Sequence, residues 1–265
     1  MLDRAFPSPR VEYLLLDLRS RQTIAMRWSH ADAPIPVGSL LKPFVALAYA
    51  ELLAKSSLHD AQFPVVYCHG KSDGCWHGAG HGSMTLERAL AASCNAYFLA
   101  LARNISAAGT RGAEALQRVS SAYDLPAPPT LTTPASLIGL SPEWRVSPLT
   151  LARAYGLLAK NSSSAQVLAG LKLAAERGGT ASKVGTPMGG VLAKTGTAPC
   201  VSGMQPNTEP CVANGNGLVV LLAPADVPRL LLLVRKRGTT GAQTAELAGR
   251  MLARIQHEEE HVPSR

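Results

Sequence analysis

The chain has 265 residues, of which 46% are hydrophobic and 17% charged, and its mean hydropathy is +0.08. These values are typical of a globular protein and exclude a disordered chain. The net charge of +8 comes from scattered Lys and Arg residues without a basic, aromatic-rich stripe, so we expect no nucleic-acid partner. No apolar run approaches the roughly 18 residues of a membrane-spanning helix, and residues 1–10 carry no secretory signal.

The N-terminal third predicts a hairpin followed by a helix. Residues 11–18 and 22–28 are rich in β-formers and flank a polar turn, which is typical of two antiparallel strands. After a breaker at residues 34–38, helix formers continue over residues 39–55. Ser39 then lies in the first turn, where Pro43 is tolerated.

The middle of the chain reads as helical. Residues 62–83 form a loop rich in Gly, His and Cys, and residues 85–103 predict one helix or two abutting helices. Further helices are expected at residues 111–123, 148–160 and 165–177.

The last third returns to strands, at residues 190–198, 217–223 and 229–234, before a closing amphipathic helix at 241–256. A sheet supplied from both termini predicts an α+β fold, with a mostly antiparallel central sheet flanked by helices and an all-helical lobe. We expect one domain over residues 1–265, with the sheet from 11–28 and 190–256 and the lobe at about 39–189.

Three short motifs combine residues that support nucleophilic chemistry. Ser39 and Lys42 are three residues apart on one helix face, where a buried neutral amine can remove the hydroxyl proton. The second motif is Ser93-Cys94-Asn95, which interrupts an apolar helical segment. The third is Lys194-Thr195-Gly196-Thr197, in a predicted strand that offers donors to a carboxylate. Each of the three motifs, taken alone, also fits an ordinary surface or turn segment.

Their order, S-x-x-K, S-x-N and K-T-G, is that of penicillin-binding proteins and class A β-lactamases. The chain resembles a penicillin-binding protein transpeptidase domain. The similarity extends to segments around the motifs, at residues 11–25, 36–39, 80–98, 147–155 and 178–181. It lacks the deacylating Glu motif of class A β-lactamases, so rapid β-lactam hydrolysis is not expected.

The resemblance implies a role for each motif residue. Ser39 would attack the carbonyl with Lys42 as its base, and Ser93 would relay the proton. Backbone N–H groups of Ser39 and Thr197 would form the oxyanion hole. The implied substrate-binding residues are Asn95, Lys194, Thr195, Gly196 and Thr197.

The implied activity is D,D-transpeptidation or D,D-carboxypeptidation of D-alanyl-D-alanine stem peptides of peptidoglycan, with β-lactams as covalent inhibitors. A sensor that acylates once, or a catalytically degenerate module, is the alternative, and Asn95 favours the enzyme. Because the substrate is extracytoplasmic, we expect the domain in the periplasm or cell envelope, with its leader or anchor absent from this chain. Membrane-anchored or cell-wall proteins are possible partners.

The five cysteines leave two interpretations open. The close pairs Cys68/Cys75 and Cys200/Cys211 favour local disulfides in an oxidising compartment, with Cys94 as the odd thiol. A zinc site is the alternative, but the spacing matches no standard zinc finger, so we predict no metal ligand and no cofactor. Its ligands would come from Cys68, His69, Cys75, His77, His81 and Cys94.

Overall fold

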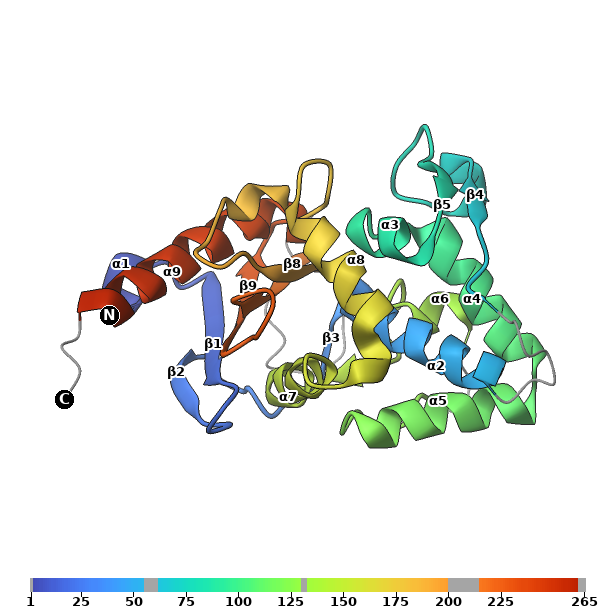
Figure 1. Ribbon diagram of the computed structural model, residues 1–265, viewed down its shortest axis with the longest axis horizontal. Coiled ribbons are helices and arrows are strands. Elements are labelled where there is room, and N and C mark those ends of the chain that lie inside the picture. Colours follow the sequence, from blue (N-terminus) through green and yellow to red (C-terminus); the bar gives the residue numbers. More distant parts are fainter. Residues whose placement is uncertain (1, 55–61, 130–132, 200–214, 262–265) are drawn as a thin grey trace.

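A five-stranded antiparallel sheet lies at the centre of the computed structural model, which describes residues 2–54, 62–129, 133–199 and 215–261 (Figure 1). Its strand order is β2-β1-β9-β8-β7, so the N-terminal hairpin pairs directly with the returning C-terminal strands. This confirms the predicted α+β fold. The strands are β1 (Val11–Asp17), β2 (Thr23–Arg27), β7 (Leu192–Ala198), β8 (Asn216–Ala223) and β9 (Leu230–Arg237).

Both faces of this sheet are covered, which explains the continuous apolar runs at residues 218–223 of β8 and 230–234 of β9. Helix α9 (Gly241–His261) and the short α1 (Leu2–Ala5) pack on one face, where Tyr13, Val219 and Met251 belong to one buried cluster. The other face contributes Leu14 and similar residues to the larger core shared with the helices. The core therefore continues from the sheet into the helical part.

Helix α2 (Lys42–Ala54) runs through the middle of the helical part (Figure 1). Its residues from Lys42 to Tyr49 are all buried, as expected for a helix surrounded by others. Around it lie α3 (Leu86–Ala91), α4 (Asn95–Ala107), α5 (Thr110–Ala122), α6 (Pro134–Leu137), α7 (Pro148–Leu158) and α8 (Ala165–Ala175).

Short elements complete the chain and refine the predictions. The helix expected from Ser39 begins as the 3-10 helix η1 (Gly38–Leu41), and the segment expected as a loop at 62–83 contains a small hairpin. The remaining elements are β3 (Ile35–Pro36), β4 (Val66–Cys68), η2 (Gly70–Asp73), β5 (Gly82–Met84), β6 (Arg145–Val146), η3 (Ser162–Ser164) and η4 (Ser182–Val184).

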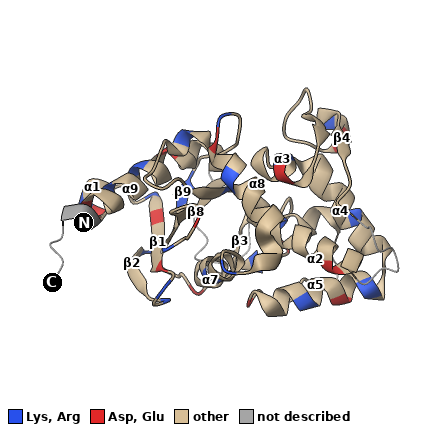
Figure 2. Ribbon diagram, in the orientation of Figure 1, with Lys and Arg blue, Asp and Glu red and all other residues tan. Residues whose placement is uncertain are grey.

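Charged residues are spread over the elements, with Lys and Arg interspersed among Asp and Glu (Figure 2). The buried Glu12 of β1 forms an ion pair with the partly buried Arg235 of the neighbouring strand β9. Within the described ranges, no helix combines the length and apolarity needed to cross a membrane.

The turn after α6 approaches the start of η1 so closely that only glycine fits. Gly139 has a φ of +76°, and a Cβ there would lie 2.1 Å from the Gly38 carbonyl oxygen. Two backbones therefore meet directly beside Ser39, without a side chain between them.

Replacing Gly139 by Ala is expected to destabilise the fold more than the same change at Gly178. Both glycines have a positive φ, but Gly178 is exposed and its Cβ would meet nothing within 4 Å. Gly178→Ala should cost roughly 1–2 kcal/mol from backbone strain, and Gly139→Ala roughly 1–3 kcal/mol more from overpacking. Urea unfolding measures both, and equal costs would contradict the close approach.

Candidate active site

The backbone around Ser39 is held against strand β7. Gly38 has a φ of +59°, and a Cβ there would lie 2.5 Å from the Thr197 carbonyl oxygen. A Cβ on Gly196 would in turn lie 2.7 Å from the Val37 carbonyl oxygen. The K-T-G glycine is therefore required by the close passage of η1, in addition to any ligand.

Ser39 itself is partly exposed, whereas its neighbours Gly38 and Leu40 are buried. Among the described residues, its hydroxyl makes no side-chain hydrogen bond, so the oxygen is available to an incoming group. The buried Tyr155 hydroxyl donates to the Leu40 carbonyl at 2.9 Å and supports the 3-10 turn from below. No sequence signal singled out Tyr155 for this contact.

Lys42 is fully buried at the start of α2, and its amine is surrounded by oxygen acceptors. The Nζ atom donates to the Ser93 carbonyl at 2.7 Å, to Asn95 Oδ1 at 2.7 Å and to Ser93 Oγ at 3.3 Å. Burial lowers the pKa of Lys42 to about 7, against a smaller opposing effect of the nearby cysteines. A substantial fraction of this lysine is therefore neutral at neutral pH.

Lys194 of β7 approaches the same hydroxyl from the sheet. Its Nζ donates to Ser93 Oγ at 2.9 Å and to the Thr195 carbonyl at 2.8 Å, and the side chain is fully buried. Desolvation, followed by the charge of Lys42, holds the pKa of Lys194 well below its usual range. The two buried amines therefore disfavour each other's protonation.

The Ser93 hydroxyl bridges the two amines and joins the sheet to the helical part. It accepts from both Lys42 and Lys194, which occupies its two lone pairs and leaves its own O–H free to donate. This position is possible because Ser93 lies at a break between α3 and α4, with a φ of +50°. The predicted alternative of two abutting helices is therefore the correct one.

Asn95 begins helix α4 and ties Lys42 to the glycine-rich loop. Its Oδ1 accepts from Lys42, and its Nδ2 donates to the Gly74 carbonyl at 3.2 Å. The amide retains one lone pair and one N–H for another partner.

The two threonines of the K-T-G segment point away from Lys194, as alternation along a strand requires. Thr195 is buried and its hydroxyl donates to Thr180 Oγ1 at 2.7 Å. Thr197 is exposed, and its oxygen accepts from the Gly241 backbone at 3.0 Å, at the beginning of α9. Thr180, in the turn that leads to β7, is a site neighbour that the sequence reasoning did not name as such.

The structure thus brings Lys42, Ser93, Asn95 and Lys194 into one buried network beside Ser39. Thr197 lies against the backbone of Gly38, next to Ser39, whereas the Thr195 side chain is held by Thr180. The predicted motif residues converge, although they come from three segments far apart in the sequence.

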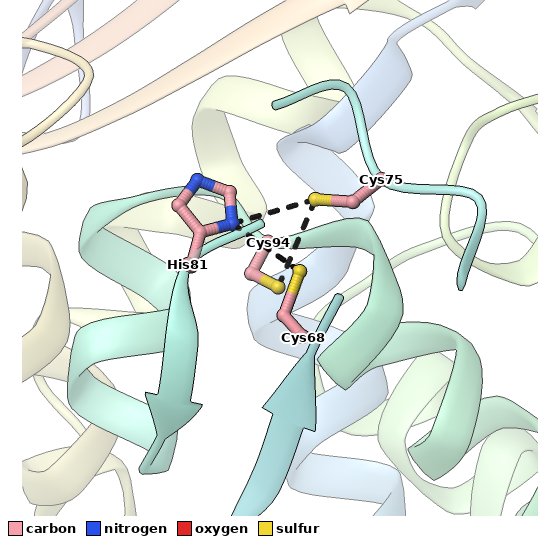
Figure 3. Close-up of side chains that lie close together, drawn as sticks. All are labelled: Cys68, Cys75, His81 and Cys94. Carbon is pink, nitrogen blue, oxygen red and sulfur yellow. Dashed lines mark hydrogen bonds between the residues drawn. The ribbon is translucent and has the colours of Figure 1, made fainter. Parts of the chain in front are cut away.

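The predicted disulfide between Cys68 and Cys75 is wrong, because both are free thiols in the structure. Their sulfurs turn toward His81, and Cys75 also approaches Cys94, so the four side chains form a cluster (Figure 3). His69 is not part of it and pairs with Asp73 on the surface. The predicted pair Cys200/Cys211 lies outside the described residues.

The fold is shared with solved penicillin-binding proteins. The chain matches PBP2 of Helicobacter pylori in complex with MreC at 16% identity and a TM-score of 0.74, over 98% of this chain and 62% of that one. The transpeptidase domain of Burkholderia pseudomallei penicillin-binding protein 3 matches at 16% identity and a TM-score of 0.69, over 97% and 89%. Pseudomonas aeruginosa PBP2 in complex with WCK 5153 matches at 17% identity and a TM-score of 0.69, over 97% of this chain and 73% of that one.

This chain therefore spans less than two thirds of the length of the H. pylori protein. No functionally curated protein matches it. The family model described as the penicillin binding protein transpeptidase domain matches residues 16–255, which include every motif discussed above. The chain therefore belongs to the penicillin-binding protein transpeptidase domain family.

Proposed function

We propose that this domain is a serine acyltransferase that forms an acyl-enzyme on Ser39 with the D-alanyl-D-alanine end of peptidoglycan stem peptides. It would act as a D,D-transpeptidase or D,D-carboxypeptidase, and β-lactams would acylate the same serine. The observation that carries this proposal is the Ser93 hydroxyl bridging two buried lysine amines beside the partly exposed Ser39.

In the first step, the Ser39 Oγ atom attacks the carbonyl carbon of the penultimate D-alanine, and its proton moves to the neutral amine of Lys42. Loss of a proton leaves Lys42 two donors, which can stay on the Ser93 carbonyl and Asn95, and a lone pair for the Ser39 hydroxyl. Catalytic hydrogen bonds of this kind often shorten only once substrate is bound.

The tetrahedral intermediate places a negative charge on the former carbonyl oxygen. Backbone N–H groups of Ser39 and Thr197 are assigned as its donors, because Gly38 and Thr197 lie in direct backbone contact. Removing one such donor typically costs about 3–4 kcal/mol of transition-state stabilisation.

The intermediate collapses by breaking the amide C–N bond. Ser93 is placed to donate its free O–H to the leaving amine of D-alanine and to recover a proton from the adjacent lysines. An acceptor amine or water then attacks the ester and releases Ser39. Attack by an amine completes transpeptidation, and attack by water completes carboxypeptidation.

The substrate's terminal carboxylate is assigned to the K-T-G strand. A bound carboxylate would favour the protonated form of the buried Lys194 amine. Thr197 presents an exposed hydroxyl whose proton is free to donate because its oxygen already accepts from Gly241. Thr195 and Gly196 would contribute through the strand backbone, since the Thr195 hydroxyl is held by Thr180 and Gly196 lies against the Val37 carbonyl.

The site and the substrate class together support an extracytoplasmic location. Peptidoglycan stem peptides are cross-linked outside the cytoplasmic membrane, so the domain would work in the periplasm or cell envelope. The H. pylori relative was solved in complex with MreC, which supports a search for a cell-envelope protein partner of this domain.

Incubation with a penicillin should add one mass of the intact drug to the chain, and Ser39→Ala should abolish this adduct because the attacking oxygen is gone. Intact-protein mass spectrometry measures both, with Ser121→Ala on the exposed side of α5 as the control that retains the adduct. An unchanged adduct in Ser39→Ala would contradict the assignment of the nucleophile. Release of D-alanine from a stem pentapeptide, with and without an acceptor amine, then separates the two reactions.

The acylation rate should rise with pH through about 7, because only the neutral Lys42 amine can accept the serine proton. Below the pKa, the neutral fraction falls tenfold per pH unit, and the rate should fall with it. Stopped-flow acylation by a chromogenic β-lactam measures this profile. Lys42→Arg should stay protonated throughout and lose roughly 10²–10⁴-fold in rate, and a pH-independent wild-type rate would count against Lys42 as the base.

Ser93→Ala should slow acylation by roughly 10²–10⁴-fold, because it removes both the proton relay and the shared acceptor of the two amines. Circular dichroism and urea unfolding should show a folded protein. Ser120→Ala, a buried serine of α5 outside the three motifs, is the matched control and should acylate at the wild-type rate. Equal rates for the two variants would remove Ser93 from the mechanism.

A further inference from the structure

Four potential metal ligands converge beneath the segment that carries Ser93 and Asn95 (Figure 3). The ligand atoms of Cys68, Cys75, His81 and Cys94 all lie within 4.8 Å of one another. The three cysteines are buried, and His81 is half-buried. The motif chemistry described above uses none of these four side chains.

Their spacing fits one tetrahedral metal ion. With Zn–S bonds of about 2.3 Å and Zn–N bonds of about 2.0–2.1 Å, a regular tetrahedron places its sulfurs about 3.8 Å apart and sulfur about 3.6 Å from nitrogen. The structure has 3.9 Å between the Cys75 and Cys94 sulfurs. It has 3.4 Å and 3.6 Å from His81 Nδ1 to the sulfurs of Cys75 and Cys68.

We propose that Cys68, Cys75, His81 and Cys94 bind one structural Zn²⁺ ion. The soft thiolate set selects zinc over the oxygen-seeking Mg²⁺ and Ca²⁺, and four protein ligands leave no open position for a catalytic water. The spacing of these residues in the sequence matches no standard finger, because the site is assembled from a hairpin and a distant helix junction.

The surrounding backbone is shaped for such a site. Cys68 ends β4, and the chain then folds back so tightly that a Cβ on Gly80 would lie 2.2 Å from the Cys68 carbonyl oxygen. A Cβ on Gly70 would lie 2.2 Å from the Gly78 carbonyl oxygen. The loop between β4 and β5 is therefore folded on itself around the cluster.

Backbone N–H groups are directed at the Cys75 sulfur. They belong to His77, Ala96 and Asn95. N–H groups directed at sulfur commonly support metal thiolates. They come from the loop and from the start of α4, the two segments that the ion would join.

The ion would position the catalytic segment without touching substrate. Cys94 lies between Ser93 and Asn95, and Asn95 donates to the carbonyl of Gly74, next to Cys75. Zinc would therefore clamp the 93–95 segment to the loop from two neighbouring points. Loss of the metal should loosen all three acceptors of Lys42, which belong to Ser93 and Asn95.

The first test is the metal content of the chain purified without chelator, measured by inductively coupled plasma mass spectrometry. We expect about one equivalent of zinc in the wild type and in Ser39→Ala, and near zero in Cys75→Ser and His81→Ala. His69→Ala, an exposed histidine of the same loop that pairs with Asp73, should keep its zinc. Because Ser39→Ala lacks the proposed nucleophile, this result stands apart from that of the proposed function.

A second measurement uses the wild type, so its result does not depend on whether the variants fold. Chelation of the wild type should lower its melting temperature and slow β-lactam acylation, and added Zn²⁺ should restore both. Co²⁺ in place of Zn²⁺ should give the visible absorption of tetrahedral thiolate coordination. A folded wild type that neither contains zinc nor binds added Zn²⁺ or Co²⁺, or one in which mass mapping finds two of these cysteines joined, would overturn the proposal.

Discussion

The burial of two lysine amines around a single serine hydroxyl is the constraint on which the rest of the site depends. Removing an ammonium group from water is costly, and the low pKa values of Lys42 and Lys194 reflect that cost. Oxygen acceptors around the two amines offset this cost, namely the Ser93 carbonyl and hydroxyl, Asn95 Oδ1 and the Thr195 carbonyl. Stability and reactivity are therefore linked, because the environment that disfavours charge on Lys42 also makes its amine a base near neutral pH.

This network needs Ser93 where a continuous helix would not place it. The break between α3 and α4 gives Ser93 a positive φ, a conformation that costs an ordinary residue about 1–3 kcal/mol unless its surroundings enforce it. The contacts that enforce it are made by the two residues that follow Ser93. Asn95 is anchored to Lys42 and to the Gly74 carbonyl, and Cys94 is anchored in the cysteine–histidine cluster. The glycine-rich loop thus supports the segment that carries Ser93 and Asn95.

Sequence reasoning succeeded where the signal is local. Apolar runs located β8 and β9, a polar turn located the first hairpin, and the order of Ser39, Ser93 and Lys194 identified the family. It failed where the answer depends on which way a side chain turns after long-range packing. Six residues separate Cys68 from Cys75, which suits a disulfide, yet their sulfurs meet His81 and Cys94 instead. Likewise, no local pattern shows that Thr180 would hold Thr195, or that Gly38 would touch the backbone of Thr197.

The contact between η1 and β7 determines how rigid the site can be. Lys194 belongs to the sheet and Lys42 to the helical part, so a shift of one relative to the other would pull apart their hydrogen bonds to Ser93. Gly38 and Gly196 place backbone directly against backbone at this junction, with no flexible side chain between them to absorb such a shift. Close-packed interfaces of this kind resist small displacements. The two glycines therefore fix the distance between Ser39, the proposed nucleophile, and the strand that would bind the carboxylate, which makes Gly196 a structural requirement of the K-T-G motif.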